Sequence, residues 1–173
     1  MAAATDDAGD SNEMIRVVSS DGEHFEMPEA AANLSLVLRH MIEDDCADAA
    51  GIPLAVVAAK PLAKIVDYCT KHAAKSSGLT IEEAEELKRF DAEFIEVDTD
   101  MLYDLLVAAD FMGVEGLSKL AVQRTADLIK GKTPEQNRET FGIVNDFTPE
   151  EEEEICKENE WAFQITKPPS RLC

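Results

Sequence analysis

The chain has 173 residues and a mass of 19.0 kDa, and its 36 acidic and 16 basic side chains give a formal net charge of -20 at pH 7. This length predicts one domain, or one domain with a small appendage, and it is sufficient to bury a core without disulfides. A pI near 4.3 excludes binding to phosphate backbones or anionic lipid, because both require clustered Lys and Arg. Nucleic acid and membranes are therefore not expected as partners, and no stretch reaches the ~20 consecutive apolar residues of a membrane span.

The cysteines and the N-terminal residues favour a reducing compartment. The four cysteines are far apart and form no C-x-x-C pair, which argues against a disulfide framework and a zinc knuckle. Residues 1–12 are acidic and lack the apolar run of a signal peptide. We expect them to form a disordered tail.

The first part of the chain predicts a β-hairpin followed by a helix. Residues 14–18 and 24–26 favour two short strands, and Asp21 and Gly22 between them are typical of a hairpin turn. Residues 29–45 repeat apolar side chains at the spacing of one amphipathic helix.

A further strand and helix are predicted before a connection. Residues 51–54 favour a short edge strand or the start of a strand, because Pro53 has no backbone N–H to donate to a central ladder. Residues 58–72 return to helical periodicity, and the small polar residues 73–80 predict a connection.

The second half of the chain predicts helices only. A Thr-x-x-Glu capping pattern at Thr80 predicts a short helix, and further helices are expected from Asp98 and after Gly113. Thr133 and Thr148 are each followed by Pro and, three residues after the Thr, by an amide or an acid, which predicts two more helix starts. Strands mixed with helices, then helices alone, indicate a small α+β domain with a helical tail.

Two short patterns resemble ligand sites. Residues 131–133, GKT, look like the end of a phosphate-binding loop, but Ala126 stands where that loop requires a second glycine. We interpret them as a helix end followed by a Thr N-cap, and we exclude nucleotide binding. Cys69 and His72 share a helix face, but two ligands do not complete a tetrahedral site, so we expect a packed Cys beside a surface His.

The acidic clusters do not indicate calcium binding or catalysis. Residues 44–48 and 98–100 contain several aspartates but lack the Gly and the terminal Glu of an EF-hand loop, so we expect acids at helix ends. The Glu run at 150–154 suits the first turn of a helix, where the dipole favours negative charge. With three His and no G-x-S-x-G motif, an enzyme is not expected.

Large apolar side chains are scattered among acids toward the C-terminus. They are Phe141, Ile143, Phe147, Ile155, Trp161, Phe163 and Ile165. They are too sparse for a separate core and too large to remain in water without a reason. Either they contact a partner or they fold back on the preceding helices, and the sequence leaves both alternatives open.

Several sequence blocks resemble one known family. The blocks are SSDGE at 19–23 with FE at 25–26, HMIEDDC at 40–46, IKGKTPE at 129–135, and NDFTPE at 145–150 with ENEWAF at 158–163. The chain is thereby similar, over most of its length, to the Skp-one adaptors (S-phase kinase-associated protein one) of SCF cullin-RING ubiquitin ligases. The endings DDC and WAF resemble the plant branch of that family.

The resemblance implies an α+β fold of the BTB/POZ type, with a small three-stranded sheet and helices. On this basis we expect a disordered tail at 1–12 and a BTB/POZ domain at 13–130, with a flexible connection near 73–80. Residues 131–165 are expected to form C-terminal helices that bind F-box proteins, and 166–173 a flexible extension.

The same resemblance implies a non-catalytic adaptor that bridges F-box substrate receptors to the N-terminal region of a cullin, in the nucleus and cytoplasm. It implies no cofactor, no metal and no small-molecule substrate. The family's F-box surface maps onto Leu106, Leu117, Leu120, Phe141, Ile143, Trp161 and Phe163. The family's Asn-Tyr cullin contact falls on Asp110 and Phe111.

The chain departs from the family's pattern at several positions. Asp110 and Phe111 add a negative charge and remove a hydroxyl, and each change weakens cullin docking by ~1 to 3 kcal/mol where the lost group was buried and bonded. Ser118 and Thr125 stand at apolar positions, and Asn137 replaces an Ile. We therefore expect a divergent member with a narrowed F-box preference.

Two rival hypotheses remain at this stage. One is a POZ adaptor of the elongin type that serves another cullin and does not need Trp161. The other is an F-box-binding protein that is uncoupled from cullin and stabilises F-box proteins, a hypothesis favoured by Asp110.

Overall fold

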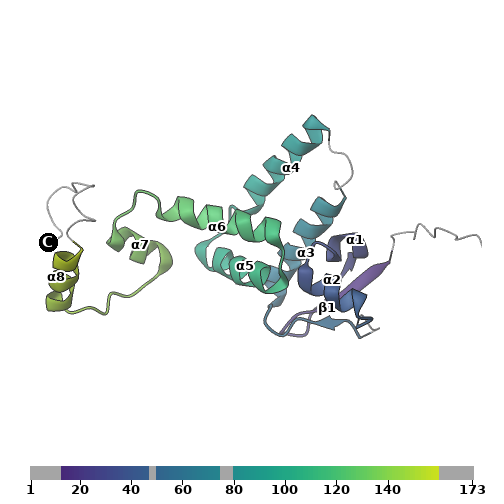
Figure 1. The fold of residues 1–173 in the computed structure, drawn as a ribbon, viewed down its shortest axis with the longest axis horizontal. Helices are drawn as coiled ribbons and strands as arrows, with labels where there is room; N and C mark the ends of the chain where they lie inside the picture. The colour runs from purple at the N-terminus through teal and green to yellow at the C-terminus, as the bar shows by residue number, and fades with distance from the viewer. Residues whose placement is uncertain (1–12, 47–49, 75–79, 160–173) are drawn as a thin grey trace, which may run out of the picture. The chain divides into compact units, whose positions relative to one another are not determined.

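The computed structural model describes residues 13–46, 50–74 and 80–159 (Figure 1). This part of the chain contains the strands β1 (Met14–Val18), β2 (His24–Pro28) and β3 (Ile52–Pro53) and the helices α1 (Glu29–Ala32), α2 (Leu36–Glu43), α3 (Ala59–Ala73), α4 (Ile81–Phe94), α5 (Thr99–Met112), α6 (Glu115–Ile129), α7 (Pro134–Phe141) and α8 (Pro149–Glu158). The fold is α+β. The chain divides into two compact units, Met1–Lys130 and Gly131–Cys173.

A three-stranded sheet with the order β2-β1-β3 forms one side of the first unit. β1 pairs with β2 in antiparallel register, with Ile15 opposite Met27, and with β3 in parallel register, with Val17 opposite Ile52. All four of these side chains are buried. The predicted hairpin and the predicted edge strand at Pro53 are confirmed.

The core of the first unit lies between this sheet and helices α1, α3 and α5. α3 contributes Leu62, Ile65 and Cys69, whose spacing of three and four residues places them on one helix face. α5 contributes Leu105 and Met112 to the same buried cluster. α6 packs beside α5, as Figure 1 also shows.

The single helix predicted for residues 29–45 is wrong: two helices, α1 and α2, are separated at residues 33–35. The buried Ser35 causes the break, because its Oγ accepts a hydrogen bond from the N–H of Leu38 at 3.2 Å and donates one to the carbonyl of Met112 at 2.6 Å. Leu34, expected on the buried helix face, is 38% exposed instead.

Replacing Ser35 with Ala is expected to lower the free energy of unfolding by about 1 to 3 kcal/mol, because it removes the α2 cap and leaves the buried Met112 carbonyl without its donor. Chemical denaturation measures this loss. Ser20→Ala, at an exposed position of the hairpin turn, is the control and is expected to change stability by no more than about 0.5 kcal/mol. Equal losses in both variants contradict the role given to Ser35.

α4 packs against α3 through aromatic side chains. The rings of Tyr68 and His72 are stacked with centroids 4.0 Å apart, and the ring of Phe94 lies 5.5 Å from that of Tyr68. His72 Nε2 lies 2.8 Å from Asp91 Oδ1. The predicted surface position of His72 is therefore wrong, since only 20% of its side chain is exposed, whereas the predicted packing of Cys69 is confirmed.

The buried thiol of Cys69 and the buried phenol of Tyr68, both on α3, predict a loss of stability at alkaline pH. Burial raises the pKa of the Cys69 thiol from 9.0 to about 12, and it also raises the pKa of Tyr68 above the ordinary 10.0. The unfolded chain therefore releases these protons at lower pH than the folded chain, and the free energy of unfolding falls as the pH rises above about 9. Denaturant midpoints in a pH series measure this fall, which Cys69→Ala is expected to make shallower; an unchanged slope contradicts the assignment.

The two helices of the second unit begin where the sequence predicted, after Thr133 and Thr148. Thr133 caps α7 by accepting from the N–H of Gln136 at 3.3 Å, while the Gln136 side chain accepts from the N–H of Thr133 at 2.9 Å. Thr148 and Glu151 form the same reciprocal pair at α8, with distances of 3.3 Å and 2.8 Å. The backbone N–H and the hydroxyl of Thr148 both donate to the Glu151 carboxylate and lower the pKa of Glu151 below its ordinary value. The Glu run thus stands in the first turn of α8.

Candidate protein-binding surfaces

The second unit exposes its apolar side chains. No residue of α7 or α8 is buried, and Ile143 and Val144 between the two helices are 58% and 82% exposed. Phe147 and Ile155 are exposed too, and Phe141 is partly buried. We call Ile143, Val144, Phe147 and Ile155 the C-terminal apolar surface.

The three leucines predicted for the F-box surface occupy different environments in the first unit. Leu106 and Leu120 are partly buried and pack against a small cluster formed around Leu102. Leu117 is completely buried in the main core, so its prediction as a surface contact is wrong. It supports the fold beneath the surface because its side chain has no area left for a partner.

α6 carries an exposed face that the sequence analysis missed. Val122 and Ile129 are exposed and lie seven residues apart, with Thr125 and Ala126 between them at helical spacing. That spacing was the available signal. The Thr125 hydroxyl donates to the carbonyl of Ala121 at 2.9 Å, so this polar departure is satisfied within its own helix.

Asn137 on α7 is a departure of a different kind. Its Oδ1 atom is inaccessible to solvent and has no hydrogen-bond partner among the described residues. A buried acceptor without a donor costs about 1 to 3 kcal/mol. Trp161 and Phe163, the two remaining residues predicted for the F-box surface, lie outside the described residues.

The predicted cullin contact stands at the C-terminal end of α5. Asp110 and Phe111 are both exposed, and Phe111 continues a row of exposed apolar side chains on α5 with Tyr103 and Val107, spaced four residues apart. A carboxylate in the last turn of a helix is disfavoured by the helix dipole. No ion pair in the described part of the chain offsets the charge of Asp110.

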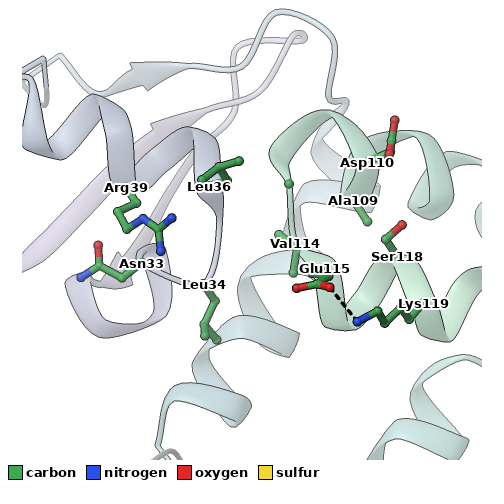
Figure 2. A pocket seen from close by; sticks show the side chains of 11 residues that line it. Asn33, Leu34, Leu36, Arg39, Ala109, Asp110, Val114, Glu115, Ser118 and Lys119 are labelled. Carbon is green, nitrogen blue, oxygen red and sulfur yellow. Dashed lines mark hydrogen bonds and ion pairs between the residues drawn. The ribbon is translucent and has the colours of Figure 1, made fainter.

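A pocket of about 560 Å³ lies beside Asp110, between the start of α2, the end of α5 and the start of α6 (Figure 2). Its lining consists of Asn33, Leu34, Leu36, Arg39, Ala109, Asp110, Gly113, Val114, Glu115, Ser118 and Lys119. Gly113 has a φ of 66°, and a Cβ atom there would lie 2.7 Å from Cβ of Leu36. Only glycine therefore allows α5 to end this close to α2. We call this cavity the Asp110 pocket.

The exposed apolar side chains described above suit the binding of another protein. Within the described residues, no group of three or more His, Cys, Asp or Glu side chains is arranged to hold a metal ion. None of the helices in this part of the chain has the length and hydropathy that a bilayer crossing needs. What the surfaces offer is exposed apolar side chains beside acids.

Comparisons with known proteins identify relatives of this chain. Residues 13–74 match the Skp1 family tetramerisation (POZ) domain, and residues 115–162 match the Skp1 family dimerisation domain. SKP1-like protein 1 of Oryza sativa subsp. japonica is 49% identical over 166 residues, which cover 87% of this chain and 95% of that protein. SKP1-like protein 1A of Arabidopsis thaliana is 49% identical over 156 residues, covering 87% and 97%.

A second relative from Arabidopsis thaliana, SKP1-like protein 4, is 48% identical over 162 residues, with coverage of 90% and 99%. A small POZ unit followed by helices that expose apolar side chains is typical of a protein that binds other proteins. The chain belongs to the Skp1 family, whose proteins are adaptor subunits.

Proposed function

We propose that this chain is the adaptor subunit of an SCF cullin-RING ubiquitin ligase and that it bridges an F-box protein to the N-terminal region of a cullin without catalysing a reaction itself. The observation that carries the proposal is the second unit, in which two well-capped helices contain no buried residue and the C-terminal apolar surface is exposed. A segment of this kind gains its apolar contacts from a partner.

The F-box partner is assigned to the C-terminal apolar surface and to the exposed face of α6. Val122 and Ile129 on α6, and Ile143, Val144 and Phe147 in the second unit, are available for contact. Burying each such side chain contributes about 1.5 to 3 kcal/mol, so a few of them are sufficient for stable binding. We propose that Leu106 and Leu120 border this contact and that Trp161 and Phe163 join it.

The cullin is assigned to a second surface, the C-terminal end of α5, which carries the charged Asp110. Phe111 offers an aromatic ring that is 40% exposed, and Asp110 carries a charge that its own helix disfavours. A basic group on the partner offsets that charge. The uncoupled hypothesis rests on the same residue, since covering the Asp110 carboxylate with a cullin that lacks such a group carries a desolvation cost.

Two separate titrations of the full-length chain test the proposal. Calorimetry with an F-box domain is expected to show 1:1 binding, and the preformed complex is expected to bind a cullin N-terminal fragment in the same way. F-box binding without cullin binding supports the uncoupled adaptor instead. Failure to bind any F-box domain in a panel contradicts the proposal.

Replacing Asn137 with Ile is expected to raise the affinity for F-box domains about fivefold across a panel. The change removes the unpaired acceptor, so α7 is held more firmly before binding and less conformational freedom is lost on association. Thr125→Val is the control: the Thr125 hydroxyl already has a partner in its own helix, so we expect less than a twofold change. Equal affinities for Asn137→Ile and the unmodified chain contradict a narrowed preference caused by Asn137.

A further inference from the structure

We infer that a polar network around Glu152 fixes the loop at residues 142–148, which carries most of the C-terminal apolar surface, and that Asn145 and Arg138 are positioning residues for the contact with an F-box protein. The loop joins α7 to α8 within the second unit. The inference rests on the proposed function and deepens it, because it makes the strength of binding depend on residues that hold the loop in place.

Within the described residues, no apolar core supports this loop. No residue of α7 or α8 is buried, and Ile143, Val144 and Phe147 are all exposed. Apolar side chains of this size gain free energy in water by packing against one another. The open arrangement of the three side chains therefore depends on polar interactions.

Capping motifs fix the two ends of the loop. At its start Gly142 has a φ of 62°, and the N–H of Ile143 donates to the carbonyl of Arg138 at 2.8 Å, as in a Schellman motif. At its end Thr148 forms the capping box of α8. The residues between these two motifs need a further attachment.

Asn145 supplies that attachment through both atoms of its amide. Its Nδ2 donates to Glu152 Oε1 on α8 at 2.6 Å, and its Oδ1 accepts from the N–H of Phe147 at 3.3 Å. A hydrogen bond to a carboxylate is about twice as strong as one between neutral groups. Asn145 thus ties the middle of the loop to α8.

Arg138 joins the same carboxylate to α7. Its Nη1 lies 3.8 Å from Glu152 Oε1 and 3.7 Å from Glu135 Oε1, and 25% of its side chain is exposed. Because these contacts are longer than a close charge-assisted pair, Arg138 is the weaker of the two ties to Glu152. A loop held in this way loses less conformational freedom when a partner covers its apolar side chains, which favours binding.

Reversing the direction of one hydrogen bond tests the network. Asn145→Asp keeps the size of the side chain but places a second carboxylate against Glu152, and it is expected to lower the affinity of the full-length chain for an F-box domain about tenfold or more. The double variant Asn145→Asp/Glu152→Gln restores the hydrogen bond, with the amide now on α8. Calorimetric titration is expected to place its affinity within about threefold of the unmodified chain.

Asn145→Asp/Glu153→Gln is the matched control. It has the same net charge, but it changes a glutamate that pairs with Lys157 within α8, at 2.9 Å. We expect it to bind as weakly as Asn145→Asp. A direct contact of Asn145 with the F-box domain would leave both double variants equally weak.

Arg138 has its own pair of variants. Arg138→Gln is expected to lower the affinity about two- to fivefold, as for a partly exposed ion pair, and Arg138→Lys, which keeps the charge, is expected to lower it less than about twofold. An affinity of Arg138→Gln equal to that of the unmodified chain overturns the role given to Arg138.

Amide hydrogen exchange of the free full-length chain reports on the loop without a partner. The N–H groups of Ile143 and Phe147 both donate within the unit. Their exchange is expected to be about fivefold faster in Asn145→Asp and to return to the unmodified rate when Glu152→Gln is added, but not when Glu153→Gln is added.

The outcomes separate this inference from the proposed function. Equal affinities of the two double variants, or exchange rates that Asn145→Asp leaves unchanged, overturn the inference and leave the adaptor function intact. Failure of the unmodified chain to bind any F-box domain contradicts the proposed function, while exchange in the free chain still decides whether the network holds the loop. Rescue by Glu152→Gln alone, in both affinity and exchange, supports the inference.

Discussion

Replacing both Ile143 and Val144 with Asp is expected to lower the affinity for an F-box domain at least a hundredfold. The two side chains are the most exposed members of the C-terminal apolar surface. If each contributes about 1.5 to 3 kcal/mol when buried, the loss of both corresponds to about 3 to 6 kcal/mol, and the introduced charges add a desolvation cost. Calorimetric titration with an F-box domain measures the change.

The stability of the folded chain provides the check on this variant. Since both side chains are exposed, the substitutions are expected to shift the free energy of unfolding by no more than about 0.5 kcal/mol each. Ile81→Asp is the matched control, because Ile81 is 82% exposed at the start of α4 and belongs to none of the proposed contacts. A loss of affinity under tenfold, or one equal to that of the control, contradicts the assigned F-box surface.

Replacing Leu117 with Ala is expected to lower the free energy of unfolding by about 2 to 5 kcal/mol, because a completely buried leucine leaves a cavity in the main core. This is a large part of the stability of a small domain, which is about 5 to 15 kcal/mol. Urea denaturation measures the loss. Leu120→Ala, at a partly exposed position three residues along the same helix, is expected to cost less.

Binding measurements on the same two variants distinguish a leucine of the core from a leucine of the contact surface. At a temperature where both variants are folded, Leu117→Ala is expected to retain its affinity for an F-box domain, whereas Leu120→Ala is expected to lose affinity. The reverse result, stable folding but lost binding for Leu117→Ala, restores Leu117 to the contact surface.

Local signals in the sequence were sufficient to predict most helix starts. The capping boxes at Thr80, Thr133 and Thr148 predicted the first residues of α4, α7 and α8, because the partners in each box are only three residues apart. Hydrophobic periodicity predicted α3 and α5 for the same reason. Information contained within one turn of helix is visible in the sequence.

Contacts between distant segments were not visible. The break at Ser35 depends on a hydrogen bond to Met112, 77 residues away, and the burial of His72 depends on its pairing with Asp91. Leu117 and Leu120 have the same chemistry and neighbouring positions, and only the packing of α6 on α5 distinguishes core from surface.

For the candidate surfaces too, some features could be predicted from the sequence and others appear only in the fold. The apolar residues near the C-terminus stood out because acids surround them, and the structure added Val144 to the group. The Asp110 pocket could not be predicted, because Arg39 and Asp110 belong to different helices and meet only in the folded unit. The departures at Asp110 and Ser118 were visible as separate changes, but their shared cavity was not.

Size-exclusion chromatography with light scattering tests the central claim, bridging, most directly. The full-length chain is co-purified with an F-box domain and a cullin N-terminal fragment is then added. The account predicts a single peak with the mass of a 1:1:1 complex. A peak that retains the mass of the F-box complex after addition of cullin contradicts bridging, and absence of an F-box complex contradicts the adaptor role altogether.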